Sequence, residues 1–258
     1  MICCAPRLAE ALYRRMRSGK GRHFGLYDGM IGNLGGRPVR IAIAEPTEES
    51  VYVAVRQMVP LSGAELVLYL GEGVAVAETL RAGDVALVGE AVRCFCPIVV
   101  TENMFPSQAG GDPGPADEFA FPDDETRHHI LNAEPLAPDH ELLSRALSVL
   151  NRNLPPASLQ SQVTAVRAGG GVVRPGVWRA GEYLRTRFGI EVTDPGVYGA
   201  MLGAADCGIR ALALELVSAG NGEDVAWEYR HRRKRFRDCA AAMMEALIGA
   251  IFSGNGHG

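Results

Sequence analysis

The sequence predicts an α/β fold, and two kinds of pattern lead to this prediction. Short, mostly apolar runs are typical of buried strands, and they occur at Leu66–Leu70, Val85–Val88 and Ala211–Val217; glycine or aspartate borders the first two. Between and after these runs the apolar residues have helical spacing, most clearly in Asp139–Asn151 and Val225–Phe252. Strands and helices that follow one another in this way favour an α/β architecture.

Length and composition narrow the possibilities. The 258 residues are enough for one large domain with a substantial core. A hydrophobic content of 47% with 22% charged residues excludes a wholly disordered chain. The net charge of −4 gives no general attraction to nucleic acid or anionic membranes, and no apolar run approaches the ~20 residues that span a bilayer. We expect one cytoplasmic domain, residues 1–258, without nucleic-acid or membrane partners.

The cysteines and histidines form no metal-binding pattern. Six cysteines lie in apolar contexts, and no C-x-x-C pair occurs. Free, buried thiols in a reducing cytoplasm are therefore expected. The pair His128-His129 has no partner histidine or cysteine at ligand spacing. We expect neither a metal nor a cofactor.

The first part of the chain predicts a strand, a helix and a hairpin. After a short apolar opening, Leu8–Met16 has apolar residues at helical spacing. Arg17–Arg22 indicates a basic turn. Gly35-Gly36 is typical of a tight hairpin turn between two extended segments, Phe24–Leu34 and Arg37–Ala44.

The stretch Leu66–Val92 is the one around which the chain is organised. Its first apolar run leads directly into Gly71-Glu72-Gly73, where glycines allow a sharp turn and a close approach to a ligand. A second turn, Ala82-Gly83-Asp84, precedes the next apolar strand. From these residues alone, an ordinary strand–loop–strand connection explains the pattern equally well.

The order strand, glycine loop, "L-x-x-GD-V" and strand resembles the central sheet of the nucleoside phosphorylase and nucleosidase superfamily. A second stretch, Val192–Ala219, resembles the superfamily signature "V-D-M-E-…-helix-…-V-R-x-x-S-D" without a gap. The resemblance covers nearly the whole chain. It implies a single-domain, three-layer α/β/α fold with a twisted mixed central sheet, a nucleoside-like small-molecule ligand and a homo-oligomer, dimeric or trimer-based. Helices Val197–Ala205 and Cys239–Phe252 would supply the contact surfaces.

The residues that carry out chemistry in this superfamily are partly replaced here. Asp194 and Ser218 match the signature, whereas its strand arginine falls on Glu215. The glutamate that binds ribose hydroxyls falls on Gly196, and the aspartate that protonates the leaving base falls on Ala219. General acid help is typically worth 10²–10⁴ in rate. Ordinary nucleosidase activity on adenosine-type substrates is therefore expected to be absent or at least ~10² lower.

Three acids are the candidate catalytic residues: Glu72, Asp194 and Glu10. Glu10 lies one residue later than an acid that orients or activates water in hydrolytic members, and a solvated helix glutamate is the alternative interpretation. Glu72 stands where phosphorolytic members bring hydroxyl groups and amides to phosphate. Because like charges ~4 Å apart repel by ~4 kcal/mol at an effective dielectric near 20, phosphorolysis is not expected.

Glu45 opens an acidic turn where the superfamily carries a glycine-rich one. This turn would repel phosphate. An acidic helix N-terminus capped by Thr47 accounts for the same residues. Both accounts can hold together.

The candidate ligand-binding residues combine this glutamate with glycines, aromatic residues and an arginine. They are Glu45, Gly71, Gly73, Arg174, Trp178, Gly196, Tyr198 and Ser218. The resemblance puts an aromatic side chain against the base at Trp178, whose indole can stack on a base face. The alternative is that Trp178 joins the helix Trp178–Phe188 to the sheet. Arg174 would hold an anionic substituent or pair with Glu182.

Three segments are expected to lie at the surface. Residues 101–138 combine prolines, glycines and acids, and they predict a long surface excursion. Arg230–Arg237 predicts a basic, solvated or subunit-facing face of the last helix, and residues 253–258 a frayed tail.

The sequence therefore predicts a divergent nucleosidase-like enzyme. It would act on a nucleoside-like or other small metabolite, in the manner of an N-glycosyl hydrolase and not by ordinary phosphorolysis. The alternative is a pseudoenzyme that binds a small molecule or serves as a scaffold. A third possibility is an acid supplied from another position by a local backbone shift. The polar character of the candidate pocket favours the first interpretation.

Overall fold

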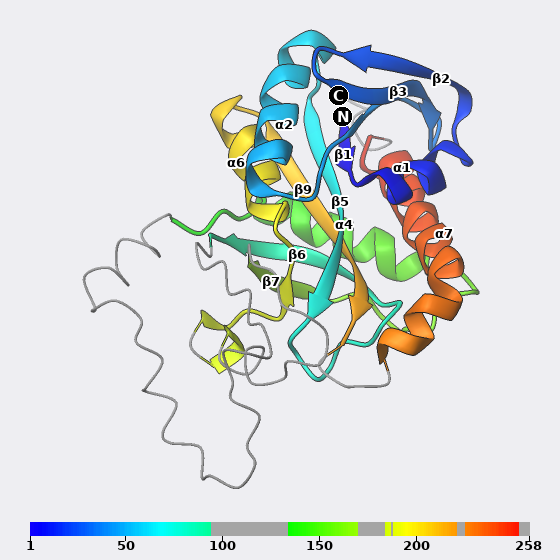
Figure 1. Ribbon diagram of the computed structural model, residues 1–258, viewed down its shortest axis with the longest axis vertical. Helices are drawn as coiled ribbons and strands as arrows, with labels where there is room; N and C mark the ends of the chain where they lie inside the picture. Colours follow the sequence, from blue (N-terminus) through cyan, green and yellow to red (C-terminus); the bar gives the residue numbers. More distant parts are fainter. Residues whose placement is uncertain (94–133, 170–183, 187, 221–224, 253–258) are drawn as a thin grey trace, which may run out of the picture.

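The computed structural model describes residues 1–93, 134–169, 184–186, 188–220 and 225–252. Within these residues the predicted strands and helices form a mixed sheet with helices on both faces (Figure 1). The strands are β1 (Ile2–Cys4), β2 (Arg17–Phe24), β3 (Tyr27–Leu34), β4 (Arg37–Ile43), β5 (Leu66–Ala75), β6 (Val85–Val92), β7 (Ala165–Gly169), β8 (Val192–Thr193) and β9 (Arg210–Ala219). The helices are α1 (Pro6–Tyr13), α2 (Glu48–Ser62), α4 (His140–Arg152), α6 (Val197–Asp206) and α7 (Val225–Ile251).

Strand β5 is the centre of the sheet. It pairs in parallel with β1 and β9, and its carboxyl end pairs with β8 in the antiparallel sense. β9 continues through β6 and β7 back to β8, so five strands pair in a closed ring. On the other side of β5, the hairpin strands β4, β3 and β2 extend the sheet beyond β1. The predicted twisted mixed sheet is confirmed, and the ring closure is a feature that the sequence pattern did not predict.

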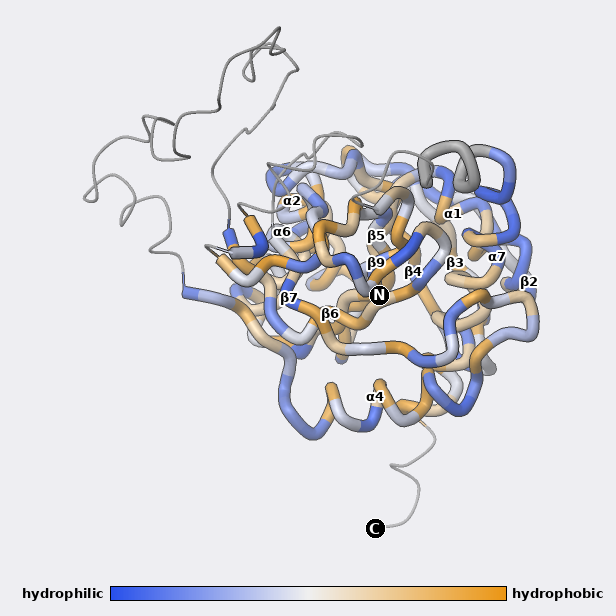
Figure 2. Tube along the Cα trace, turned by 90° about the horizontal axis from the view of Figure 1, so that it is seen from below, coloured by the Kyte–Doolittle hydropathy of each residue, from blue (hydrophilic) through white to orange (hydrophobic). Residues whose placement is uncertain are grey.

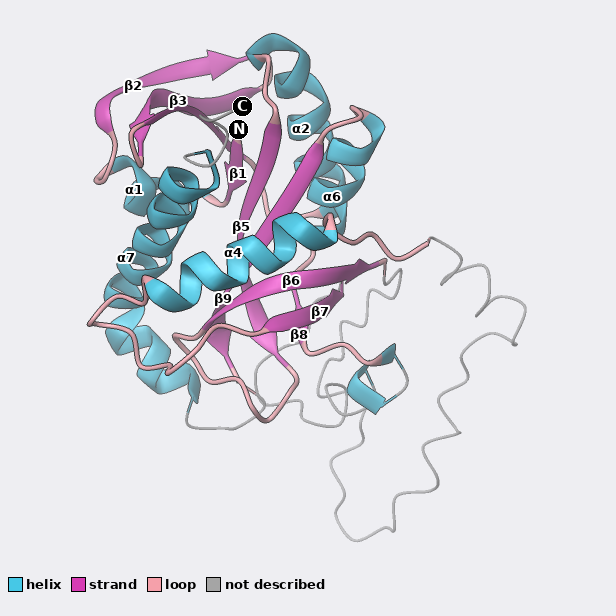
Figure 3. Ribbon diagram, turned by 180° about the vertical axis from the view of Figure 1, so that it is seen from behind, coloured by secondary structure: helices cyan, strands magenta, loops and turns pink. Residues whose placement is uncertain are grey.

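Two apolar cores separate the sheet from its helices, which confirms the three-layer arrangement. Helices α2 and α6 cover one face, and α1, α4 and α7 cover the other (Figures 1 and 3). On the α7 side, Leu12, Leu150 and Phe236 belong to one buried cluster. On the α2 side, Val55 and Ala200 belong to the second. Apolar stretches of the tube accordingly gather along the central strands (Figure 2).

Local signals fix several element boundaries. The Thr47 side chain accepts a hydrogen bond from the Ser50 amide at 3.2 Å, which confirms it as the cap of α2. Asp139 caps α4 in the same way, at 2.9 Å from the Leu142 amide. Gly35 and Gly36 have φ values of 59° and 75°, a left-handed turn that places β3 and β4 side by side.

The basic segment at Arg17–Arg22 is a strand and not a turn. It belongs to β2, which pairs with β3 through Gly21 opposite Met30 and Arg22 opposite Gly29. β2 is an edge strand whose side chains are mostly exposed. It therefore lacks the apolar alternation by which a strand is predicted, and its glycines and charges imitate a turn.

The small residues of α6 serve packing inside the chain. A Cβ atom at Gly199 would lie 2.1 Å from the Glu48 carbonyl oxygen, and one at Gly203 would lie 2.9 Å from the Val55 Cβ. The two helices α2 and α6 thus approach closely because these residues are glycines. In α7, Cys239 and Leu247 are buried in the same way. The homo-oligomer, and its contact through these two helices, stay a prediction.

Several expectations fall outside the described residues. These are the cysteines Cys94 and Cys96, the pair His128-His129, most of the excursion at 101–138, the tail at 253–258 and most of the helix Trp178–Phe188. Of the other cysteines, Cys3, Cys4 and Cys239 are buried and Cys207 is half-buried, all as free thiols. Within the described ranges, no helix is long and apolar enough to cross a membrane. In the same ranges, no three His, Cys, Asp or Glu side chains are grouped for a metal ion.

Candidate functional site

The glycines of Gly71-Glu72-Gly73 lie within a strand, which corrects the predicted loop. β5 continues through them to Ala75. Their role is close packing, because a Cβ atom at Gly71 would lie 2.3 Å from Glu215 Oε2 and one at Gly73 would lie 2.6 Å from Val192 Cγ1. Because Gly71 and Gly73 have no side chains, they leave room for a cluster of polar side chains against the strand.

Asp194 is the centre of this cluster and is fully buried. Its Oδ1 atom accepts hydrogen bonds from the Tyr69 hydroxyl at 2.9 Å and from the amides of Gly196 and Val197. Its Oδ2 atom accepts one from the Glu72 amide at 3.2 Å. The side chain thus caps the amino end of α6 and ties it to β5. Burial raises the pKa of Asp194, and these hydrogen bonds oppose the rise.

Glu215, from the neighbouring strand β9, is the second buried acid of the cluster. Among the described residues no donor supplies either of its oxygens with a hydrogen bond. Burial raises the pKa of Glu215 well above its usual value, and the charge of Asp194 and the hydrogen bond between the two acids raise it further. Because Asp194 already accepts four hydrogen bonds, we infer that Asp194 is the carboxylate and that Glu215 holds a proton shared with it.

Tyr69 occupies the space beside Gly196. A Cβ atom at Gly196 would lie 2.4 Å from the Tyr69 hydroxyl oxygen. The position that the resemblance assigns to a ribose-binding glutamate is therefore filled from β5. Any side chain at Gly196 meets this hydroxyl, although the backbone there, at φ −92°, suits any residue.

The Glu72 side chain lies on the opposite face of β5 from the Asp194 cluster and contacts α7. Arg237 donates to both of its oxygens, from Nε at 3.2 Å and from Nη2 at 2.8 Å. The Arg237 side chain is 11% exposed and the Glu72 side chain is 19% exposed. The pair therefore lies at the edge of the core and can be reached from outside. The guanidinium thus holds both carboxylate oxygens of Glu72 with charge-assisted hydrogen bonds. The sequence pattern placed Arg237 on a basic, solvated or subunit-facing face of the last helix, whereas in the structure its side chain is paired with Glu72 and 11% exposed.

The remaining candidates near these strands have structural partners. The Ser218 hydroxyl donates to the Gly73 carbonyl at 2.8 Å and holds β9 against β5. Tyr198 is 3% exposed and lies under the Arg93 guanidinium, 5.8 Å from the ring centre. Arg93 also pairs with Glu48 at 2.8 Å.

The structure weakens the predicted electrostatic repulsion of phosphate by glutamates. Glu72 and Glu48, the latter from the acidic turn that Glu45 opens, are both ion-paired, and Glu45 itself is exposed in the turn before α2. Glu10 lies on the exposed surface of α1 and pairs with Arg14 at 2.9 Å, as the alternative interpretation stated. Arg174 and Trp178 lie outside the described residues.

Sequence reasoning missed three residues of the cluster as site residues: Tyr69, Glu215 and Arg237. Glu215 left a signal, because it is the single acid inside an apolar run that reads as a buried strand. Tyr69 was hidden in another apolar run. Arg237 was one of many cations in its helix, and its partner lies 165 residues away in the sequence.

No known protein-family model and no curated protein sequence matches the chain. Solved structures do match its fold. The 5'-methylthioadenosine/S-adenosylhomocysteine nucleosidase from Neisseria meningitidis has a TM-score of 0.72 at 16% identity, over 96% of this chain and 97% of that one. Futalosine hydrolase of Helicobacter pylori has a TM-score of 0.71 at 12% identity, over 96% and 95%. The chain therefore has the fold of the nucleoside phosphorylase and nucleosidase superfamily, as the resemblance implied.

The contact between Tyr69 and Gly196 predicts non-additive stability changes. Tyr69→Phe should cost about 1–3 kcal/mol because a buried hydrogen bond to Asp194 is lost. Gly196→Ala should cost a similar ~1–3 kcal/mol by overpacking against the hydroxyl. In the double variant the methyl group meets no hydroxyl, so urea unfolding should show coupling of about 1 kcal/mol. Gly21→Ala, which adds a methyl group in open space, should combine additively with Tyr69→Phe. If the changes in unfolding free energy were additive for Gly196→Ala as well as for Gly21→Ala, the contact between Tyr69 and Gly196 would be contradicted.

The proton on Glu215 predicts a pH-dependent stability. Because its folded-state pKa lies above the unfolded one, the folded protein binds one more proton between the two values. This contribution is complete below the unfolded pKa and is lost as pH rises, by about 1.4 kcal/mol per pH unit in the interval. Glu215→Gln keeps a donor toward Asp194 without titrating. Urea unfolding between pH 5 and 9 should show a flatter pH dependence for this variant, but not for Glu78→Gln. Parallel curves for wild type and Glu215→Gln would disprove the assignment.

Proposed function

We propose that this protein is a divergent N-glycoside-hydrolase-like enzyme that binds a nucleoside-like metabolite at the carboxyl ends of β5 and β9. Two features support the proposal. The fold is that of enzymes described as nucleosidases and as a futalosine hydrolase, although sequence identity is low. At the corresponding end of β5, the Glu72–Arg237 pair is polar and can be reached from outside.

The ion pair of Glu72 is the observation that carries this proposal. When the bond between a sugar and its base stretches, the sugar acquires oxocarbenium character and positive charge. A carboxylate fixed by Arg237 is placed to stabilise such a charge or to accept hydrogen bonds from sugar hydroxyls. It costs no reorganisation, because both guanidinium contacts are already made. Water then takes the place of the leaving base at the sugar carbon.

The described residues offer no accessible proton donor at this end of the sheet, which bears on the choice of leaving group. Among the described residues at this end of the sheet, both oxygens of Glu72 accept hydrogen bonds from Arg237, Glu215 is fully buried and Ala219 has no acidic group. A base that leaves as a neutral molecule without protonation is then favoured. Nucleosides with a cationic base, such as 7-methylguanosine, have this property, whereas adenosine-type nucleosides do not.

Phosphate is not proposed as the co-substrate. Charge repulsion alone does not support this, since Arg237 and Arg93 balance two of the glutamates. The support comes from the carboxylate at Glu72, which occupies a position that phosphorolytic members leave to hydroxyl groups and amides. Water is the acceptor that such a site accommodates.

The alternative is a pseudoenzyme that binds a nucleoside-like molecule without turning it over. The replaced positions Gly196 and Ala219 favour it, and so does the burial of Asp194 and Glu215. The two functions share the ligand and differ in turnover, so one experiment separates them. Homo-oligomerisation is proposed with either function and rests on the fold alone.

The experiment compares release of free base from 7-methylguanosine, 5'-methylthioadenosine and inosine by chromatography, with the Neisseria meningitidis nucleosidase as reference. We expect turnover of 7-methylguanosine and rates on the other two at least ~10² below the reference. Glu72→Gln should lower the rate by about 10² while Glu78→Gln, an exposed acid nearby, should not change it.

Two outcomes would change the conclusion. Rapid release of adenine from 5'-methylthioadenosine would show that an acid is supplied from another position and would refute the leaving-group argument. Ligand binding by calorimetry without any turnover, abolished by Glu72→Gln, would establish the pseudoenzyme.

A further inference from the structure

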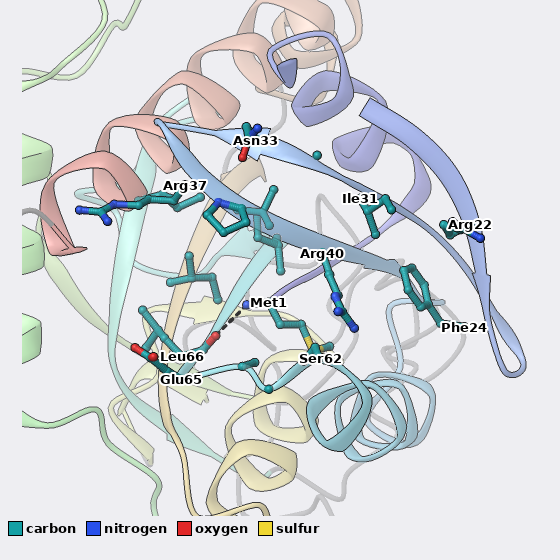
Figure 4. A pocket seen from close by; sticks show the side chains of 18 of the residues that line it. Met1, Arg22, Phe24, Ile31, Asn33, Arg37, Arg40, Ser62, Glu65 and Leu66 are labelled. Atoms are coloured by element: carbon teal, nitrogen blue, oxygen red, sulfur yellow. Dashed lines mark hydrogen bonds between the residues drawn. The ribbon is translucent and has the colours of Figure 1, made fainter. Parts of the chain in front are cut away.

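A cavity of about 1080 Å³ lies at the opposite end of β5 from Glu72. The strands β2, β3 and β4 curve over the first residues of β1 and β5 and form its roof (Figure 4). The loop Ser62–Glu65 and the end of α7 contribute the sides. Leu66 and Leu68 line it, whereas Glu72 lies in the carboxyl half of the same strand. The cavity is therefore separate from the candidate site.

The cavity combines apolar walls with cations. Its apolar lining residues include Phe24, Ile31, Val39, Leu66, Leu68 and Ile248. Its permanent cations are Lys20 and Arg22 on β2 and Arg37 and Arg40 on β4. Glu65 is the single carboxylate among the described lining residues. In a chain of net charge −4, this local excess of positive charge points to an anion.

Arg40 is the cation that points into the cavity. It extends from β4 toward Ser62 and the Phe24 ring (Figure 4). It is half-buried, and its described hydrogen bond, to the Leu61 carbonyl, uses one of its five N–H donors. Arg37 behaves differently, because it extends toward α7 and donates to the Phe252 carbonyl at 2.7 Å.

Lys20 and Arg22 add charge at the mouth of the cavity. Both lie on the exposed edge strand β2, and both line the same cavity as Arg40. Several cations around one opening match a doubly charged anion better than a singly charged one. A guanidinium additionally presents two parallel donors to phosphate oxygens. The apolar walls beyond them suit the organic part of such a ligand.

We propose that this cavity binds a small organic phosphate whose apolar body lies against Phe24 and Ile31 and whose phosphate contacts Arg40, Lys20 and Arg22. The site would be independent of the nucleoside-like ligand at the other end of β5. The proposal therefore does not rest on the proposed function, and either can fail alone.

Isothermal titration calorimetry with 1-naphthyl phosphate tests the proposal. We expect one saturable site, and binding of 1-naphthol or inorganic phosphate should be about tenfold weaker or more, since each lacks half of the contacts. Arg40→Gln should weaken the binding of 1-naphthyl phosphate by about tenfold or more, which is the loss expected for one charge-assisted hydrogen bond. Lys20→Gln/Arg22→Gln changes two exposed side chains and gives a second variant should Arg40→Gln fail to fold.

Two controls make the result specific. Arg56→Gln removes an exposed arginine of α2 that does not line the cavity, and Glu72→Gln alters the other site. Both should bind 1-naphthyl phosphate like the wild type. The proposal is overturned by absent or non-saturable binding, by equal binding of 1-naphthol or inorganic phosphate, by equal loss in Arg56→Gln or Glu72→Gln, or by wild-type affinity in a folded cavity variant.

Discussion

The close approach of two fully buried acids, Asp194 and Glu215, is the feature on which the centre of this structure depends. It requires a glycine at position 71, because a side chain there would meet both carboxyl groups. It requires a hydroxyl group at Tyr69 to hold Asp194, and this hydroxyl in turn requires a glycine at position 196. One pair of acids thus determines the residue type at three positions: Tyr69 and Gly71 on β5, and Gly196 at the start of α6.

This pair also separates the two sides of the candidate site. On the buried side, Asp194 accepts four hydrogen bonds and Glu215 is fully buried, so both acids lie between the strands and the start of α6. On the accessible side, Glu72 projects from the same strand toward Arg237. The division places Asp194, which matches the superfamily signature, inside the protein, and it leaves Glu72 as the acid of this group that can be reached from outside.

The fold was predictable and the cluster only in part. Apolar runs located β5, β6 and β9, the cap Thr47 located α2, and helical spacing located α4, because these signals are local. β2 was missed because an edge strand has no buried face to leave a pattern. Glu72 and Asp194 could be selected as polar residues beside buried strands. Of their partners, Glu215 left only the signal of a single acid in an apolar run. Tyr69 and Arg237 left none, since pairing across the sheet and onto α7 depends on tertiary contacts that neither spacing nor composition encodes.

The most direct test of this account is the protonation state of Glu215. Carbon-13 NMR of the glutamate side-chain carboxyls, followed from pH 5 to 9, reports each group separately. The account predicts one resonance that keeps the chemical shift of a protonated acid at pH 7 and that is missing from Glu215→Gln. If every glutamate carboxyl has ionised by pH 6, the two buried acids do not share a proton and the account is contradicted.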